Sequence, residues 1–291
     1  MPPNLPDRTF PVPLRHGGGD RPYLAHEPAV LPDRAPLVVQ LHGRGIDPQM
    51  FDLWTGFSAL ADEQGFLLAM PRAVGEIWND GRYRGPAWPG RDGIDDVGYL
   101  LAVIDDATDR WGIDPSRVYA VGMSNGATMA GRLAWERAER LAAIAQVAGT
   151  ASVDVAARAR PIVPLPVLEI HGTRDRFAPY DGGRASAPWA RLLVRYPAGP
   201  SLGVDAWAAM WIARNGVAAT PQVEAVGDDV TIRRWTGPTP SSDVVLCRVE
   251  GGGHSWPGAR VWMPPHLGRT SRTIDATRLA WEFLAAHRRD A

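Results

Sequence analysis

Strand-like apolar runs alternate with segments of helical spacing along the chain, and this alternation restricts the fold more than any other sequence feature. Strands are predicted at 35–43, 66–71, 117–123, 166–172 and 243–251. The first of these, APLVVQLHG, is apolar at nearly every position and ends in glycine, which is typical of a strand buried on both faces. Such strands occur in parallel sheets that carry helices on both sides.

Between these runs, the spacing of apolar residues predicts helices over 50–65, 95–112, 125–144, 204–216 and 277–289. Strand and helix therefore alternate over almost the whole length, which predicts an α/β fold with a mainly parallel central sheet. We find no internal repeat and no low-complexity linker, so we expect residues 36–291 to form one domain. Residues 1–35 are rich in proline and glycine and are expected to add an edge strand to it.

Composition argues against several classes of partner. The chain has 291 residues, a net charge of -1 and a pI near 6.7, so it lacks the field that gathers nucleic acid or anionic lipid. No stretch approaches the ~20 apolar residues of a membrane span, and the N-terminus lacks the apolar core of a secretory signal. We expect a cytoplasmic protein, unless an export leader precedes this sequence. The oligomeric state stays open.

The chain contains one cysteine, so it cannot form an internal disulfide. This residue, Cys247, lies in the apolar strand-like run DVVLCRVEG. A catalytic thiol is the sharper hypothesis, but a small buried hydrophobic residue is the more common role in such a run.

The stretch Gly122-Met123-Ser124-Asn125-Gly126 reads G-x-S-x-G and lies between a predicted strand and a predicted helix. In an open parallel sheet, reactive groups gather at the carboxyl ends of the strands, and Ser124 follows one such end. A nucleophile at this turn has a strained backbone and needs small residues two positions before and after it, here Gly122 and Gly126. The alternative is an ordinary serine that caps a helix.

A nucleophilic serine needs a base, and the base needs an orienting acid. In this type of fold the three residues follow the order Ser, Asp or Glu, His. Asp175 lies in the turn after the strand PVLEIHG, and His254 lies in a glycine-rich loop after DVVLCRVEG. Both follow strand carboxyl ends, as Ser124 does. We therefore predict Ser124 as nucleophile, His254 as base and Asp175 as acid.

Four other residues could compete for the roles of base and acid. His171 precedes the predicted acid, so its order is wrong, and a structural role supporting the acid turn suits it better. Asp181 lies farther from the strand end, where a turn or cap role is more usual. His266 and His287 lie in a proline-flanked loop and at a polar helix end, where surface placement is expected.

The turn His42-Gly43-Arg44-Gly45 closes the first buried strand. A turn of this kind lends one backbone N–H to an oxyanion hole, and the residue after the nucleophile lends the other. We therefore predict the N–H groups of Arg44 and Asn125 as the oxyanion donors. For Gly45 taken alone, a tight turn that requires glycine remains an equal explanation.

Four segments resemble the polyhydroxybutyrate-depolymerase-like esterases of the α/β-hydrolase superfamily, a group that includes feruloyl and acetylxylan esterases. They are LHGRG, DDVGYLLAVIDDATDRWGIDPSRVYAVGMSNGATMA, HGTRDRFAPYDGG and GGGHSWPG, within residues 21–258. The resemblance implies an α/β-hydrolase fold and an acyl-enzyme mechanism for carboxylic esters. It also implies Ser124, Asp175 and His254 as the catalytic triad. Where many relatives have a cysteine after the first His-Gly, this chain has Arg44.

The long segment 72–93 has aromatic residues without a period, and a loop of this length is usually functional or mobile. Trp78 in this loop and Trp256 after the predicted base are candidates for an apolar wall that binds substrate. The alternative is that both pack beneath their own loops. The Arg44 side chain is a candidate ligand for a substrate carboxylate or hydroxyl, or it is solvated.

The predicted activity is hydrolysis of a small, oligomeric or polymeric ester, with no metal or organic cofactor. LHGRG is also similar to small carboxylesterases of the phospholipase type, which makes a small soluble ester the second substrate hypothesis. A serine peptidase on the same fold and a catalytically silent binding module are the remaining alternatives.

Overall fold

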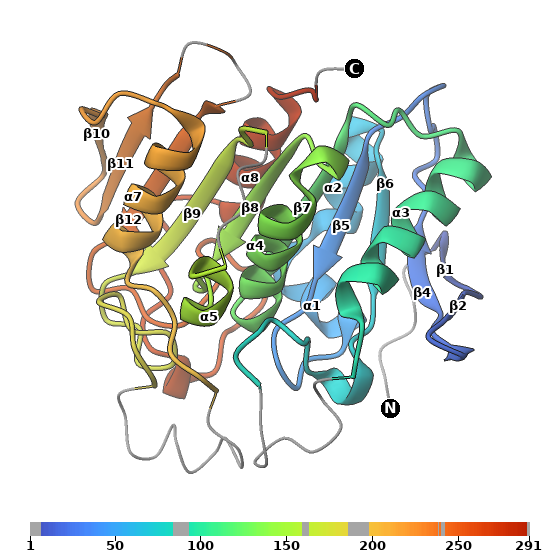
Figure 1. Ribbon diagram of the computed structural model, residues 1–291, viewed down its shortest axis with the longest axis horizontal. Helices are drawn as coiled ribbons and strands as arrows, with labels where there is room; N and C mark the ends of the chain where they lie inside the picture. The colour runs from blue at the N-terminus through green and yellow to red at the C-terminus, as the bar shows by residue number, and fades with distance from the viewer. Residues whose placement is uncertain are drawn as a thin grey trace.

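The computed structural model describes residues 7–83, 93–158, 163–185, 198–237, 239 and 242–289. Its main feature is a ten-stranded sheet with the strand order β1-β4-β6-β5-β7-β8-β9-β12-β11-β10 (Figure 1). The strands are β1 Thr9–Val12, β4 Tyr23–His26, β5 Leu37–Leu41, β6 Leu67–Pro71, β7 Val118–Met123, β8 Ala143–Val147, β9 Val167–Gly172, β10 Gln222–Val226, β11 Val230–Trp235 and β12 Val244–Val249. A small hairpin pairs β2 Arg15–His16 with β3 Gly19–Asp20.

The six central strands, from β6 to β12, are parallel. Each predicted apolar run forms one of them, and their residues are buried almost without exception because helices cover both faces. The predicted α/β fold with a mainly parallel sheet is confirmed. As a consequence, the carboxyl ends of β5, β7, β9 and β12 lie along one edge of the sheet.

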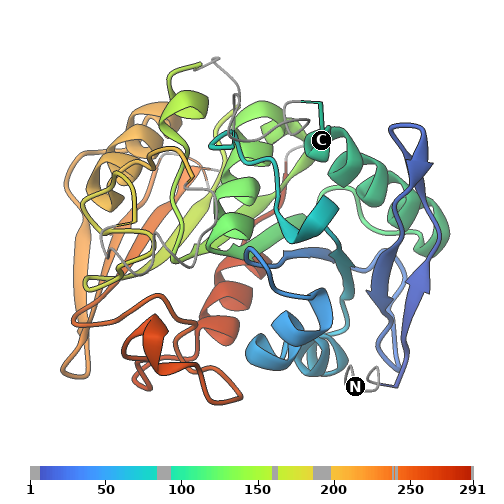
Figure 2. The same cartoon turned by 90° about the horizontal axis from the view of Figure 1, so that it is seen from below.

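Helices cover the sheet in two layers, seen edge-on in Figure 2. One layer consists of α3 Asp96–Trp111, α4 Asn125–Arg137, α5 Val153–Ala156 and α7 Val204–Asn215, and the other of α1 Pro48–Thr55, α2 Phe57–Gln64 and α8 Ala276–Ala285. Short 3-10 turns lie at η1 Val74–Glu76, η2 Ala138–Arg140 and η4 Pro265–Leu267. Each layer buries its own hydrophobic cluster against the sheet. Within the described ranges, no helix is both long and apolar enough to cross a bilayer.

Two predicted helices differ from the structure. The segment 50–65 is two helices rather than one, because Gly56 takes a left-handed conformation (φ 72°) and ends α1. The segment 125–144 leaves the helical conformation after Arg137, and residues from Ala143 onward form β8. The alanine-rich sequence AIAQV suits a helix by propensity, but β8 lies between β7 and β9, and pairing with both of them decides its conformation.

The sheet edges come from antiparallel strands. The predicted N-terminal edge strand is present: β4 pairs with β6, and β1 pairs with β4. The hairpin of β10 and β11 at the opposite edge was not predicted, since β10 is mostly exposed and shows no apolar run. Cys247 in β12 is fully buried, and burial raises its pKa to about 12, so it is a core residue and not a reactive thiol.

Candidate active site

Ser124 lies at the tight turn between β7 and α4, where the backbone is strained. Its φ of 58° and ψ of -119° are unusual for a residue with a side chain, as predicted for this turn. A Cβ on Gly122 would lie 2.5 Å from the carbonyl carbon of Gly126, and a Cβ on Gly126 would lie 2.1 Å from the carbonyl oxygen of Leu41. Both positions therefore require glycine, because the crowding atoms belong to the backbone.

Gly126→Ala is expected to destabilise the protein by roughly 3 kcal/mol or more, at or above the usual range for overpacking, because the Leu41 carbonyl cannot rotate away from the new methyl group. Gly19→Ala is the matched control, since a Cβ there has no atom within 4 Å and should change stability by less than about 0.5 kcal/mol. Urea unfolding of both variants measures the difference. Equal stability of the two variants would contradict the close packing of this turn.

The fold brings together the three residues predicted as a triad. His254 Nε2 lies 2.9 Å from Ser124 Oγ, and His254 Nδ1 lies 2.7 Å from Asp175 Oδ2. Asp175 and His254 are 4% and 6% exposed, so their hydrogen bond is shielded from water, whereas Ser124 is only half-buried. With the proton on Nδ1 donated to Asp175, Nε2 is the atom able to accept the Ser124 hydroxyl proton.

Asp175, the predicted acid, is held by its own turn. Asp175 Oδ1 accepts hydrogen bonds from the N–H groups of Phe177 and Ala178, both at 2.8 Å, which leaves Oδ2 facing His254. The rival acid Asp181 lies in an exposed turn, as expected for a turn residue.

His171 supports this turn from within the core, in agreement with its predicted structural role. Its Nδ1 lies 2.6 Å from Glu169 Oε1, its Nε2 lies 2.8 Å from the Ala178 carbonyl oxygen, and Asp175 Oδ2 is 3.7 Å away. Burial alone would lower the pKa of His171, but the hydrogen bond and charge of Glu169, with a further contribution from Asp175, raise it to about 9. Burial likewise raises the pKa of Glu169 to about 7, so the buried His171–Glu169 pair retains protons that the unfolded chain would release.

This shift predicts a pH dependence of stability. A histidine whose folded pKa exceeds its unfolded value of 6.5 contributes stability below pH 6.5 and loses that contribution as the pH rises through about 9. Glu169→Gln removes the main partner that holds the proton. The free energy of unfolding of the natural protein should therefore fall between pH 6.5 and pH 9, on the order of 2 kcal/mol more than in Glu169→Gln.

Urea unfolding at the two pH values measures this difference. Glu224→Gln, an exchange of an exposed glutamate on β10, is the matched control and should keep the fall of the natural protein. An unchanged fall in Glu169→Gln would show that the His171–Glu169 pair does not hold an extra proton.

The loop after β5 lies beside the nucleophile, and a Cβ on Gly43 would be 3.7 Å from Ser124 Cβ. His42 anchors this loop: its Nε2 accepts a hydrogen bond from Ala73 N at 3.1 Å, and burial lowers its pKa to about 4, so the ring is neutral. Gly45 has a φ of 70°, which accounts for glycine there by conformation. Arg44 and Asn125, the predicted oxyanion donors, both line the same pocket as Ser124.

The expectation that Trp78 and Trp256 form a wall for substrate is wrong. Both indoles are fully buried, and neither lines the pocket. Trp78 Nε1 donates to the His42 carbonyl oxygen at 3.0 Å, while its backbone N–H donates to Asn125 Oδ1 at 2.7 Å. Trp78 thus ties the loop after β5 to the start of α4. Trp256 packs edge-on against Phe51, and its Nε1 donates to Thr277 at 3.0 Å in the core.

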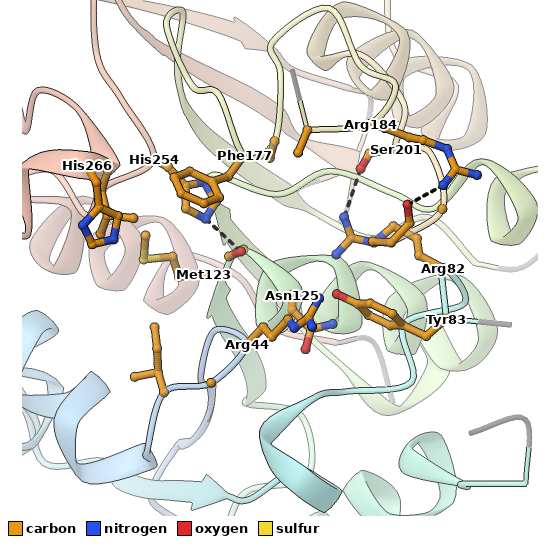
Figure 3. Close-up of a pocket in the computed structure, with 18 of the residues that line it drawn as sticks. Arg44, Arg82, Tyr83, Met123, Asn125, Phe177, Arg184, Ser201, His254 and His266 are labelled. Carbon is orange, nitrogen blue, oxygen red and sulfur yellow. Dashed lines mark hydrogen bonds between the residues drawn. The ribbon is translucent and has the colours of Figure 1, made fainter. Parts of the chain in front are cut away.

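A pocket of about 400 Å³ opens in front of Ser124 and contains residues that the sequence did not single out. They include Arg82 and Tyr83, Phe177, Arg184 and Ser201 (Figure 3). Phe177 packs against the His254 ring at a centroid distance of 5.2 Å. Its position two residues after the predicted acid is a signal that could have identified it. The expected functional loop 72–93 reaches the pocket through residues 82–83, and its residues 84–92 lie outside the described ranges.

The two remaining histidines differ in placement. His266 is exposed in η4, as expected, and it also lines the pocket and contacts Phe177 edge-on at 6.3 Å. His287 was expected at the surface but is buried, because its Nδ1 lies 2.7 Å from the Phe283 carbonyl oxygen and its own carbonyl accepts from the Tyr119 hydroxyl at 2.8 Å. Neither competes with His254 for Ser124.

Comparison with known proteins places this chain in a family. A sequence model of the family described as Esterase PHB (polyhydroxybutyrate) depolymerase matches residues 22–178. The chain is 32% identical over 261 residues to a protein of Nocardia uniformis subsp. tsuyamanensis named as an esterase, NocK, with 87% of this chain and 75% of that protein aligned. It is 27% identical over 184 residues to feruloyl esterase B of Piromyces equi, which covers 62% of this chain and 32% of that longer enzyme.

Among solved structures, an acetyl xylan esterase from Aspergillus awamori has a TM-score of 0.59 at 13% identity, over 91% of this chain and 94% of that one. This likeness shows a shared α/β-hydrolase fold. The family match covers more than half of this chain, and the similarity to NocK extends over most of it. The chain therefore belongs to the esterase PHB depolymerase family, and it is a carboxylic ester hydrolase.

Proposed function

We propose that this protein cleaves carboxylic esters through a covalent acyl-enzyme in which Ser124 is the nucleophile, His254 the general base and Asp175 the orienting acid. The observation that carries this proposal is the continuous chain of contacts from Ser124 Oγ to His254 Nε2 at 2.9 Å and from His254 Nδ1 to Asp175 Oδ2 at 2.7 Å. The three residues lie at the carboxyl edge of a parallel sheet, and Ser124 and His254 line a pocket that is large enough for a small ester.

The reaction proceeds in two halves. Ser124 Oγ attacks the ester carbonyl carbon while His254 Nε2 takes its proton, and Asp175 stabilises the imidazolium that forms. His254 then gives this proton to the leaving alcohol as the carbon–oxygen bond breaks, which leaves an acyl group on Ser124. A water molecule, deprotonated by His254, attacks the acyl carbon and releases the carboxylic acid.

The negative charge on the carbonyl oxygen is stabilised by backbone N–H groups. Asn125 is the first residue of α4, so its N–H has no acceptor within the helix and points towards the carboxyl edge of the sheet. Arg44 follows Gly43 in the loop beside Ser124 and supplies the second N–H. Loss of one such donor typically costs ~10²–10³ in kcat.

The substrate is proposed to be a small or oligomeric ester rather than a peptide. The two sequence relatives reported above are named as an esterase and a feruloyl esterase, and neither is named as a peptidase. The strained serine turn and the buried Asp175–His254 bond also argue against a catalytically silent binding module, because a binding role needs neither.

A fluorophosphonate probe tests the proposal directly. The probe is expected to label Ser124 alone, as identified by peptide mass spectrometry, and p-nitrophenyl esters of increasing acyl length should be hydrolysed. Hydrolysis of peptide amides without ester turnover would support the peptidase instead. Absence of both labelling and ester turnover in the folded protein would overturn the proposal.

A further inference from the structure

The pocket at Ser124 has a strongly uneven charge. Three arginines, Arg44, Arg82 and Arg184, are among its described lining residues, and no aspartate or glutamate is among them. An ester carbonyl needs only the oxyanion donors, so the triad does not explain three guanidinium groups in one small pocket. Guanidinium groups are the side chains best suited to bind carboxylates, through charge-assisted and often paired hydrogen bonds.

The charge of Arg82 is already neutralised by a carboxylate beside it. Its Nε and Nη2 donate to Asp80 Oδ2 at 3.0 and 2.6 Å, and its Nη1 donates to Ser201 Oγ at 3.1 Å. The Asp80 side chain is fully buried and also accepts from Asn125 Nδ2 at 2.6 Å. The Asp80–Arg82 pair therefore adds no net charge, but it fixes the wall against which a bound group would lie.

Arg44 and Arg184 are the other two guanidinium groups among the described lining residues. The Arg44 guanidinium lies 5.7 Å from the centre of the buried Tyr83 ring, which holds the long side chain on the pocket wall. Arg184 is exposed and lines the pocket, and among the described contacts its guanidinium makes one hydrogen bond, from Nη1 to the Ala198 carbonyl oxygen at 3.2 Å.

The opposite end of the pocket is apolar. In Figure 3, Met123, Phe177 and His266 lie on the left beside His254, whereas Arg82 and Arg184 lie with Tyr83 and Ser201 on the right and Arg44 lies in the middle beside Asn125. Asn125, the residue after Ser124, lies between the left and right groups. A bound ester would thus have its scissile bond between an apolar region and a cationic region.

From this division we propose that the substrate is an ester that carries a carboxylate on one side of the scissile bond, bound by Arg44 and Arg184, with an apolar group on the other side against Phe177. The inference rests on the proposed function and specifies its substrate class. An ester of a hydroxy acid with a free carboxylate, or a monoester of a dicarboxylic acid, has this chemistry.

Two pairs of esters test the proposal, each comparing a carboxylate with a neutral amide of the same shape. Monoethyl adipate against ethyl adipamate places the charge on the acyl side, and 4-acetoxybutanoate against 4-acetoxybutanamide places it on the alcohol side. We expect kcat/KM for the acid to exceed that for the amide by about tenfold or more in one of the two pairs, as for a hydrogen bond to a charged group. The pair that responds identifies the side that faces the arginines.

The variants Arg44→Gln and Arg184→Gln are each expected to reduce the acid-to-amide ratio by about tenfold in the responding pair. Arg15→Gln is the matched control: its side chain is 79% exposed in β2, away from the pocket, and the ratio should stay as in the natural protein. Circular dichroism confirms that each variant is folded. Added salt should also lower the acid-to-amide ratio of the natural protein, because salt screens exposed charges.

The outcomes separate this inference from the proposed function. If the ester bonds of the neutral amide compounds are cleaved and the acid-to-amide ratio of kcat/KM is near or below one in both pairs, the carboxylate site is overturned. The assignment as an esterase then stays intact. A high acid-to-amide ratio that persists in both arginine variants overturns the assignment to Arg44 and Arg184. Failure to hydrolyse any ester overturns the proposed function itself.

Discussion

Ser124→Ala is expected to lower kcat for p-nitrophenyl esters by about 10⁶-fold, since loss of the nucleophile alone costs nearly as much as loss of a whole triad. The protein should remain folded, because alanine fits the space of serine and Ser124 Oγ makes its hydrogen bond to His254 alone among the described contacts. Residual turnover would reflect substrate binding and the oxyanion donors. Steady-state kinetics at saturating ester, together with thermal unfolding, measure both properties.

Ser255→Ala is the control for this variant. Ser255 follows the proposed base in the sequence, but its hydroxyl donates to the Arg269 carbonyl oxygen at 3.2 Å and not to the triad. Its kcat should stay within a few fold of the natural protein. If Ser124→Ala kept most of its activity, another residue would have to be the nucleophile, and the fluorophosphonate adduct would lie elsewhere.

Asp175→Asn is expected to lower kcat by about 10⁴-fold through the tautomer of His254. The turn would keep its structure, because an amide oxygen can still accept from the N–H groups of Phe177 and Ala178. The amide NH₂ would then replace Oδ2 and donate to His254 Nδ1, which at present donates to Asp175. The ring proton would move to Nε2, where it prevents acceptance of the Ser124 hydroxyl proton.

The rival acid provides the control. Asp181→Asn changes an exposed turn residue and should leave kcat nearly unchanged. The kcat of both variants, measured on the same p-nitrophenyl ester, distinguishes the two carboxylates. A large loss in Asp181→Asn with little loss in Asp175→Asn would transfer the role of the acid to Asp181.

The parts of the fold that were predicted correctly depend on local patterns. The strands β5, β7, β9 and β12 are short apolar runs because both of their faces are buried, so each is visible in a window of a few residues. The local sequence does not decide the conformation of β8. Its alanine-rich sequence resembles the helix before it, and only its position between two strands decides its state.

The residues of the site likewise divide into those that local sequence patterns predict and those that they do not. Ser124, Asp175 and His254 each follow a predicted strand end, and the carboxyl ends of parallel strands share one edge, so the sequence indicated that they would meet. No comparable rule predicts the direction in which a side chain in a loop points. Trp78 was expected to face substrate, yet its indole turns inward to the His42 carbonyl oxygen, a contact between residues 36 positions apart.

The sequence by itself therefore determined five of the six central parallel strands, the strained serine turn and the residues at the strand ends, because these follow from periodicity and from the steric demands of neighbouring residues. Only the tertiary structure decided the walls of the pocket. Arg82 meets Ser201 across 119 positions, and Phe177 meets His254 across the sheet edge. Contacts of this kind depend on how distant loops pack together, and that packing leaves no periodic pattern in the chain.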